Sequence, residues 1–208
     1  MNPYADRTIA AYRMRADEAA ESWRMIRVPS RFLNRFAREL PKRGRVLDYG
    51  CGIGKELAWL RGRGFRAEGV EGTLEFAREA RRRCPGVRIR HARFERYPPP
   101  LNVYDGIWCN AALIHVPPEE FARQLRKIRA ALKPGGFLGL TLIWGRHKGF
   151  LHRDWIPGRY FACYWKPEAL SFLQEGWQVL SCRIVTGDGR KGRWIQVLCR
   201  PENIMKAG

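Results

Sequence analysis

The spacing of hydrophobic positions divides the chain into three parts. Residues 5–25 and 30–40 carry hydrophobic side chains three and four positions apart, which is the spacing of one face of a helix. Ser30 is the expected N-cap of the second helix. Short apolar runs then alternate with helix-like segments up to residue 144, and the pattern becomes irregular at 145–165. The first part therefore predicts helices, and the second predicts strands joined by helices.

The alternating part predicts five strands and three helices. Strands joined by helices form right-handed crossovers, which place the strands parallel in one sheet. After residue 165 the pattern predicts one more helix and two closing strands joined by a hairpin at 186–190. We therefore predict an α/β fold with a doubly wound, mostly parallel seven-stranded sheet and helices on both faces. The expected strands are 45–49, 64–70, 87–91, 104–109, 137–144, 177–185 and 193–199, and the expected helices after residue 45 are 54–62, 73–83, 117–132 and 167–175.

The irregular segment 145–165 is rich in glycine, histidine and aromatic residues. An excursion of about twenty residues inside a compact domain is uncommon and is often functional. We expect it to cover a substrate pocket as an aromatic lid, and the alternative is a packing element over an open sheet edge. We expect one domain over 1–208, divided into an N-terminal helical cap (1–43), a ligand-binding core (44–144), the lid segment and a C-terminal helix with strands (166–208).

Composition places few further limits on the chain. Hydrophobic residues make up 45%, so wholesale disorder is not expected. The longest apolar run, Phe137–Trp144, is far shorter than the roughly 20 residues that cross a bilayer, and no secretory signal is visible. The six cysteines contain no C-x-x-C pair, which favours neither a zinc site nor a disulfide framework. These features predict a cytoplasmic protein without a membrane partner.

The net charge of +19 has two interpretations. It can indicate an anionic partner such as nucleic acid or a phosphorylated metabolite. Alternatively it reflects a compositional preference for arginine, since the basic residues are spread along the chain and interspersed with acids. We favour the compositional explanation and keep the anionic partner as an alternative.

A glycine-rich loop follows the first predicted strand, in the stretch Val46–Gly54. Its glycines stand at alternate positions, where a missing Cβ lets the backbone approach a ligand, and the next helix presents free N–H groups. The G-x-G-x-G spacing differs from the G-x-G-x-x-G of dinucleotide folds. Lys55 is followed by Glu56 and not by Ser or Thr, which excludes a P-loop. Glu71 ends the second strand, where a carboxylate can accept both hydrogens of a ribose diol.

Over roughly residues 45–144, and more loosely to its end, the sequence resembles the class I S-adenosylmethionine (SAM)-dependent methyltransferases, small bacterial members above all. This resemblance implies a Rossmann-like fold, SAM as cofactor and transferase activity. The stretches that carry it are Val46–Gly54, Gly69–Glu71, Tyr104–Trp108, Asn110–Pro117, Leu132–Gly136 and Gly158–Phe161.

The resemblance also implies roles for single residues. Gly50, Gly52 and Gly54 would line the methionine part of SAM, and Asp48 would order the loop. Glu71 would hold the ribose hydroxyls. Phe94 occupies the adenine position, where its ring or a backbone contact is expected because the nearest acid, Glu95, is displaced. Asn110 would lie near the sulfonium.

Methyl transfer from SAM mainly requires a nucleophile held in line with the methyl group at about 3 Å, with water excluded. A general base is needed only if the acceptor is protonated, and His115 is the candidate base, with a packing role as an equal alternative. Tyr12 and Trp23 could close the other side of the pocket. We expect no metal site, because the histidines have no carboxylate pattern around them. The candidate acceptor-binding residues are Trp144, His147, His152 and Tyr160.

Three functions follow from these observations. The first is methyl transfer to oxygen, nitrogen or sulfur of a small-molecule acceptor. The second is methylation of RNA or of a nucleotide-linked anionic substrate, motivated by the net charge. The third is a non-catalytic SAM-binding protein, because a fold alone does not establish catalysis.

Overall fold

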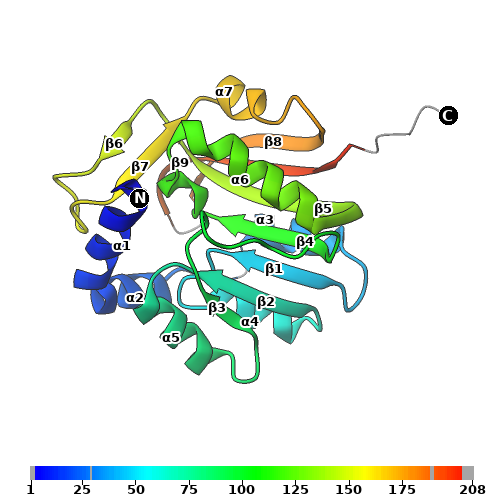
Figure 1. Cartoon of the computed structure of the whole chain (residues 1–208), viewed down its shortest axis with the longest axis horizontal. Coiled ribbons are helices and arrows are strands. Elements are labelled where there is room, and N and C mark those ends of the chain that lie inside the picture. The colour runs from blue at the N-terminus through cyan, green and yellow to red at the C-terminus, as the bar shows by residue number, and fades with distance from the viewer. Residues whose placement is uncertain (1–2, 29, 188–189, 203–208) are drawn as a thin grey trace.

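The computed structural model describes residues 3–28, 30–187 and 190–202, arranged as an α/β fold (Figure 1). The chain begins with helices α1 (Pro3–Met14), α2 (Ala16–Arg24) and α3 (Arg31–Arg38). The predicted single helix over 5–25 is thus wrong: it is broken at Arg15, whose ψ of 31° lies outside the helical range. The predicted N-cap of α3 is confirmed, because Ser30 Oγ accepts a hydrogen bond from the Leu33 backbone N–H at 3.0 Å.

The described residues form a nine-stranded sheet, which contains the seven predicted strands and two more from segment 145–165. The parallel strands run in the order β3-β2-β1-β4-β5, and the C-terminal strand β9 pairs antiparallel with both β5 and β8. The seven predicted strands are found as β1 (Arg45–Tyr49), β2 (Arg66–Glu71), β3 (Ile89–His91), β4 (Tyr104–Asn110), β5 (Leu132–Trp144), β8 (Trp177–Gly187) and β9 (Arg190–Pro201). The turn residues 188 and 189 of the predicted hairpin lie outside the described residues.

Helices cover both faces of this sheet, because side chains alternate between the two faces along each strand. From β1, Leu47 and Tyr49 pack in one cluster with α6, while Val46 packs in the other with α3, α4 and α5. Both faces are therefore buried, which explains the nearly continuous apolar strands. The helices that follow the strands are α4 (Lys55–Gly62), α5 (Leu74–Arg83), α6 (Pro118–Ala131) and α7 (Lys166–Ser171), together with the short 3-10 helix η1 (Leu113–His115).

Segment 145–165 is more regular than expected. It contains strand β6 (Lys148–Phe150), which pairs antiparallel with strand β7 (Tyr160–Tyr164), and β7 extends the sheet beside the end of β5. Strand β5 also begins earlier than predicted, since Leu132 pairs with Tyr104 before the register shifts. Pairing with neighbouring strands, which the local sequence does not reveal, produces both differences.

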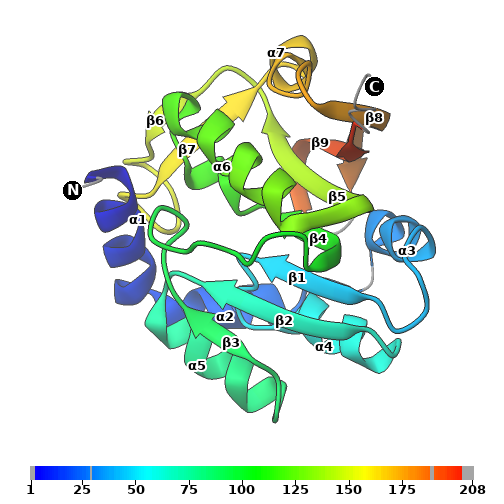
Figure 2. The same ribbon diagram turned by 45° about the vertical axis from the view of Figure 1, so that its right-hand side comes forward.

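Helices α1 and α2 lie beyond the carboxyl ends of the parallel strands (Figure 2). Only these two helices of the predicted helical segment 1–43 are called the N-terminal cap below. The cap contacts β7 and η1, and Thr8 Oγ1 accepts a hydrogen bond from the Tyr160 backbone N–H at 2.9 Å. Ligands of open α/β folds bind at this edge of the sheet. Within the described part of the chain, no helix combines the length and apolar character needed to cross a membrane.

Candidate functional site

A cavity of about 900 Å³ lies at the carboxyl edge of the sheet, beneath the N-terminal cap. Its walls come from the glycine loop, from the ends of β2 and β4, from η1 and from the segment 151–161. The predicted site residues among its lining are Gly50, Gly52, Glu71, Phe94, Asn110, His115 and His147. The remaining predicted residues, Asp48, Gly54, Trp144, His152 and Tyr160, are not part of the lining.

The glycine loop adopts the backbone that its sequence requires. Gly50, Gly52 and Gly54 all have positive φ, which residues with a Cβ rarely adopt. A Cβ at Gly50 would lie only 2.4 Å from the Cβ of Ala112, so the loop and the turn after β4 are in direct contact. A Cβ at Gly54 would instead lie 3.0 Å from Ala80 of α5, so Gly54 packs against a helix and does not line the cavity.

Glu71 at the end of β2 is buried and points toward the glycine loop. Its Oε2 accepts a hydrogen bond from the Gly52 backbone N–H at 2.9 Å, and its Oε1 accepts one from the Thr73 N–H at 2.8 Å. Burial raises the pKa of this carboxyl, and these hydrogen bonds partly offset the rise. A carboxylate offers about four lone-pair positions, so each oxygen can still accept from a ligand hydroxyl.

Asp48 lies under the same loop and is only 1% exposed. Neither carboxylate oxygen makes a hydrogen bond of good geometry, and the Leu57 backbone amide stabilises the charged form only weakly. Burial, followed by the charges of Glu56 and Glu71, raises its pKa well above the ordinary value. Acidic side chains thus gather around the loop, and a positively charged ligand there would favour their ionised forms.

Asn110 closes the cavity beside these acids. Its Nδ2 donates to Glu56 Oε1 at 2.5 Å, and its Oδ1 accepts from Thr141 Oγ1 at 2.6 Å. Thr141 Oγ1 also accepts from the Ala111 N–H at 2.8 Å, in a turn where Ala111 has a positive φ of 55°. The Asn110 amide is therefore fixed in orientation at the end of β4.

Phe94 forms a flat wall of the cavity. Its ring stacks on Tyr49 with centroids 4.6 Å apart and the planes 21° from parallel. Lys127 on α6 donates from its ammonium to the carbonyls of Phe94 and Glu95, at 2.8 and 3.0 Å. Tyr49 thus holds the ring and Lys127 holds the backbone of this wall, and a flat ring suits a planar ligand group.

His115 takes part in a chain of hydrogen bonds whose directions are determined. Its Nδ1 lies 2.8 Å from the Tyr160 carbonyl oxygen, which can only accept, so Nδ1 carries the proton. Nε2 then accepts from the Tyr12 hydroxyl at 3.0 Å, and the Tyr12 oxygen accepts from Arg159 Nη1 at 3.0 Å. Burial is the main cause that lowers the pKa of His115 to about 4, and the nearby Arg159 charge adds to it. The imidazole is therefore neutral at physiological pH.

Arg159 is the buried cation of the cavity and was not among the predicted site residues. It is 4% exposed, forms an ion pair with Asp154, and lies within 4.8–5.2 Å of the ring centres of Tyr12, Trp155 and Phe161. The stretch Gly158–Phe161 had marked this position only by resemblance. Its contact with Tyr12, 147 positions away in the chain, could not be read from local sequence.

The predicted acceptor residues are not brought together. His147 lies exposed at the cavity wall, whereas the His152 side chain is exposed and outside the lining. Trp144 packs on Trp165 and under the Arg193 guanidinium. Tyr160 contributes its backbone carbonyl to His115 while its ring packs elsewhere. Among the described residues, no group of three or more His, Cys, Asp or Glu side chains is placed to hold a metal ion.

Comparison with known proteins gives consistent matches. A family model described as "Methyltransferase domain" matches residues 19–173. The chain is 33% identical to trans-aconitate 2-methyltransferase of Rhodopseudomonas palustris over 100 residues, which is 47% of this chain and 38% of the relative. It is 35% identical to methyltransferase GfsG of Streptomyces halstedii over 107 residues, 48% of this chain and 37% of the relative. The chain thus matches well under half the length of these two relatives.

The fold also matches solved structures. The structure of 1,6-didemethyltoxoflavin-N1-methyltransferase of Burkholderia thailandensis, which contains S-adenosylhomocysteine (SAH), superposes with a TM-score of 0.70. The match covers 93% of this chain and 88% of that protein, at 20% sequence identity. At this identity the similarity establishes the shared fold alone.

Proposed function

Because this chain belongs to the methyltransferase domain family, we propose that it is an enzyme that transfers the methyl group of SAM to oxygen, nitrogen or sulfur of a small-molecule acceptor. One observation carries the proposal: Glu71 and the positive-φ glycine loop meet, hydrogen-bonded to each other, at the wall of one cavity. This arrangement places backbone groups that can bind the polar end of an amino acid beside a carboxylate that can bind a sugar.

The residues present fit this cofactor. Glu71 would accept the two ribose hydroxyls, the backbone at Gly50 and Gly52 would border the methionine part, and Phe94 would stack on the adenine. The acidic side chains of Asp48, Glu56 and Glu71 complement a ligand that carries an ammonium and a sulfonium, because those positive charges would favour their ionised forms. When bound, SAM supplies an electrophilic methyl group on a positively charged sulfur.

The acceptor would enter on the side of Tyr12, His115 and Arg159, where aromatic rings exclude water. A neutral imidazole with a lowered pKa is a weak base, so His115 would orient Tyr12 and accept a proton only from an acidic acceptor. Two of the similar proteins are named for small molecules, trans-aconitate and 1,6-didemethyltoxoflavin, which supports a small-molecule acceptor here. We place the reaction in the cytoplasm, where the six free thiols would stay reduced.

An acceptor that carries phosphate is the second candidate. A neighbouring cavity of about 390 Å³ is lined by Arg13, His91, Arg93 and Arg96, and Arg93 also lines the main cavity. These side chains could hold an anionic extension of the acceptor, such as a nucleotide or an RNA backbone. Binding of tRNA that weakens steeply with salt would favour this candidate over a small metabolite.

Isothermal titration of SAH into the wild-type protein and into Glu71→Gln tests the proposal. The variant removes the charge that the diol would meet, so its affinity should fall about 10- to 100-fold, as expected for a lost charged hydrogen bond. Glu68→Gln is the matched control, because Glu68 lies on the same strand and pairs with Arg45 away from the cavity. An absence of SAH binding by the wild type would overturn the proposal.

The acceptor is then found by incubating the enzyme with cell extract and methyl-labelled SAM. Label in the low-molecular-weight fraction is expected. Label confined to RNA would favour the second candidate, and SAH binding without any transfer would indicate a non-catalytic SAM-binding protein.

A further inference from the structure

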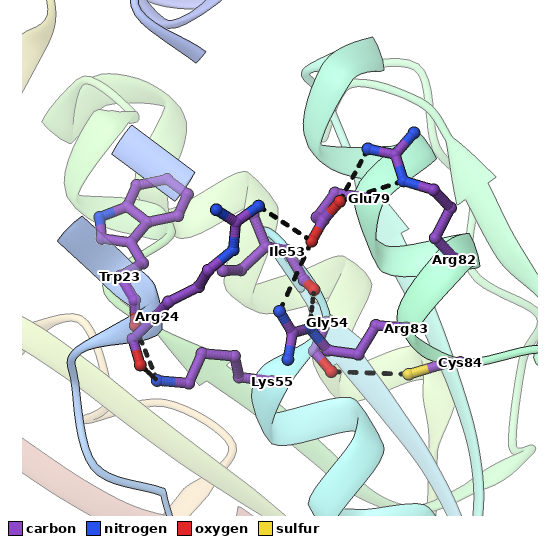
Figure 3. Close-up of polar contacts among 9 residues, drawn as sticks. All are labelled: Trp23, Arg24, Ile53, Gly54, Lys55, Glu79, Arg82, Arg83 and Cys84. Carbon is purple, nitrogen blue, oxygen red and sulfur yellow. Dashed lines mark hydrogen bonds and ion pairs between the residues drawn. The ribbon is translucent and has the colours of Figure 1, made fainter. Parts of the chain in front are cut away.

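Lys55 occupies an unexpected position for a cation. It is the first residue of α4, directly after Gly54, where the helix N-terminus already carries a partial positive charge. A lysine there is unfavourable unless its ammonium finds compensating partners elsewhere. The side chain does so by reaching away from its own helix toward the N-terminal cap (Figure 3).

The Lys55 ammonium donates to three backbone carbonyls around the end of α2. Its Nζ lies 2.7 Å from the Trp23 oxygen and 2.9 Å from the Arg24 oxygen, and it also bonds the Ile26 oxygen. The C-terminal end of a helix lacks internal donors for its last carbonyls and carries partial negative charge. Lys55 therefore joins the positive end of α4 to the negative end of α2, with all three ammonium hydrogens used.

A second polar tie runs from α2 to α5. Glu79 accepts from Arg24 at 3.3 Å, and it also pairs with Arg82 and Arg83 (Figure 3). Arg83 in turn donates from Nε to the Ile53 carbonyl at 3.0 Å. The end of α2, the glycine loop and α5 thus belong to one polar network.

This network holds a wall of the cavity in place. The Trp23 ring lies 3.4 Å from the position that a Cβ of Gly52 would occupy, so it directly covers the glycine loop. The same ring packs on Phe76 and Tyr12, with centroids 4.7 and 5.7 Å apart. The residues of this wall that line the cavity are Ser22, Trp23, Met25, Ile26 and Val28.

We propose that Lys55 is a positioning residue that holds Trp23 over the glycine loop and so sets how long the cofactor stays bound. The inference rests on the proposed function of the same cavity. Lys55 is itself part of the cavity lining, but its three ammonium hydrogens are all donated to backbone carbonyls, so its charge acts on the wall and not on the ligand. Loosening the wall should speed release more than it changes capture.

Lys55→Met tests this, because methionine keeps an unbranched apolar stem and removes the ammonium. SAH should dissociate about tenfold faster in stopped-flow measurements, with an association rate no lower than that of the wild type. That loss of affinity equals about 1.4 kcal/mol. In steady-state assays, KM for SAM should rise while kcat stays within about twofold, a split that general destabilisation would not produce.

Lys133→Met is the matched control. It removes the same charge, but its ammonium pairs with Asp105 at 2.8 Å and does not line the cavity. It should release SAH at the wild-type rate. Equal dissociation rates for Lys55→Met and Lys133→Met would overturn the inference.

Two further measurements keep the test decisive. If Lys55→Met does not fold, Arg24→Gln replaces it, because this variant removes the second tie at an exposed position. SAH should dissociate from Arg24→Gln about two- to threefold faster than from the wild type. An unchanged dissociation rate counts against the inference. If the wild type does not bind SAH, the proposed function fails by itself. The tie is then still tested by hydrogen exchange of residues 19–26, which should be faster in Lys55→Met than in Lys133→Met.

Discussion

Replacing Gly50 by alanine should destabilise the protein through two separable effects. Gly50 has a φ of 90°, and adopting a left-handed conformation costs a residue with a Cβ about 1–2 kcal/mol. The new Cβ would also lie 2.4 Å from the Ala112 Cβ and 3.3 Å from Phe94 Cζ. Overpacking of this kind costs a further ~1–3 kcal/mol. The total is about 3 kcal/mol, which lowers Tm by roughly 9 °C in a chain of this size.

Gly64→Ala isolates the backbone effect. Gly64 has nearly the same φ, 88°, and a Cβ there would have no atom within 4 Å. It should cost only about 1–2 kcal/mol, from the backbone term alone. Adding Ala112→Gly to Gly50→Ala removes the shortest contact and leaves 3.3 Å as the next one. A double-mutant cycle of Gly50→Ala and Ala112→Gly should therefore give a favourable coupling energy, which measures the overpacking cost of Gly50→Ala.

Urea unfolding followed by far-UV circular dichroism measures these energies, and titration with SAH measures their effect on the site. Gly50→Ala should weaken SAH binding, while Gly64→Ala should bind as the wild type does, because Gly64 lies outside the cavity lining. If Gly50→Ala and Gly64→Ala lose the same stability and show no coupling with Ala112, the contact between the glycine loop and the turn after β4 is not as described.

Two further predictions concern pH. Because burial raises the pKa values of Asp48 and Glu71, acidification should neutralise them earlier than ordinary carboxyls and weaken binding of SAM more than binding of SAH, which lacks the sulfonium charge. Titrations at a series of decreasing pH values should show the ratio of SAM affinity to SAH affinity falling, and a constant ratio would contradict the acidic cluster. The pKa of about 4 at His115 means that this residue is already neutral at higher pH, so kcat/KM should show no inflection from it near 6.5. An inflection there that disappears in His115→Gln would refute the lowered pKa.

Much of the fold and of the cofactor side followed from local pattern. Alternating apolar runs and helical spacings predicted seven of the nine strands that the structure describes and the helices between them, because a strand and a helix each repeat their apolar positions over a few consecutive residues. The same holds for the glycine loop, whose positive φ angles only glycine adopts readily, and for Glu71, which reaches the loop because neighbouring parallel strands end at one edge.

The proposed acceptor side and the ties of the N-terminal cap depend on contacts between distant segments. Tyr12, His115 and Arg159 come from three separate parts of the chain, and no periodicity links them. Trp144 was a candidate by its aromatic character, yet it packs outside the cavity lining because pairing of β5 with β7 and β9 sets its direction. Local conformational preference acts over a few residues, so sequence alone determined the seven predicted strands, the helices that follow them and the glycine loop. Packing of the cap and of segment 145–165 onto the sheet decided which side chains meet in the cavity.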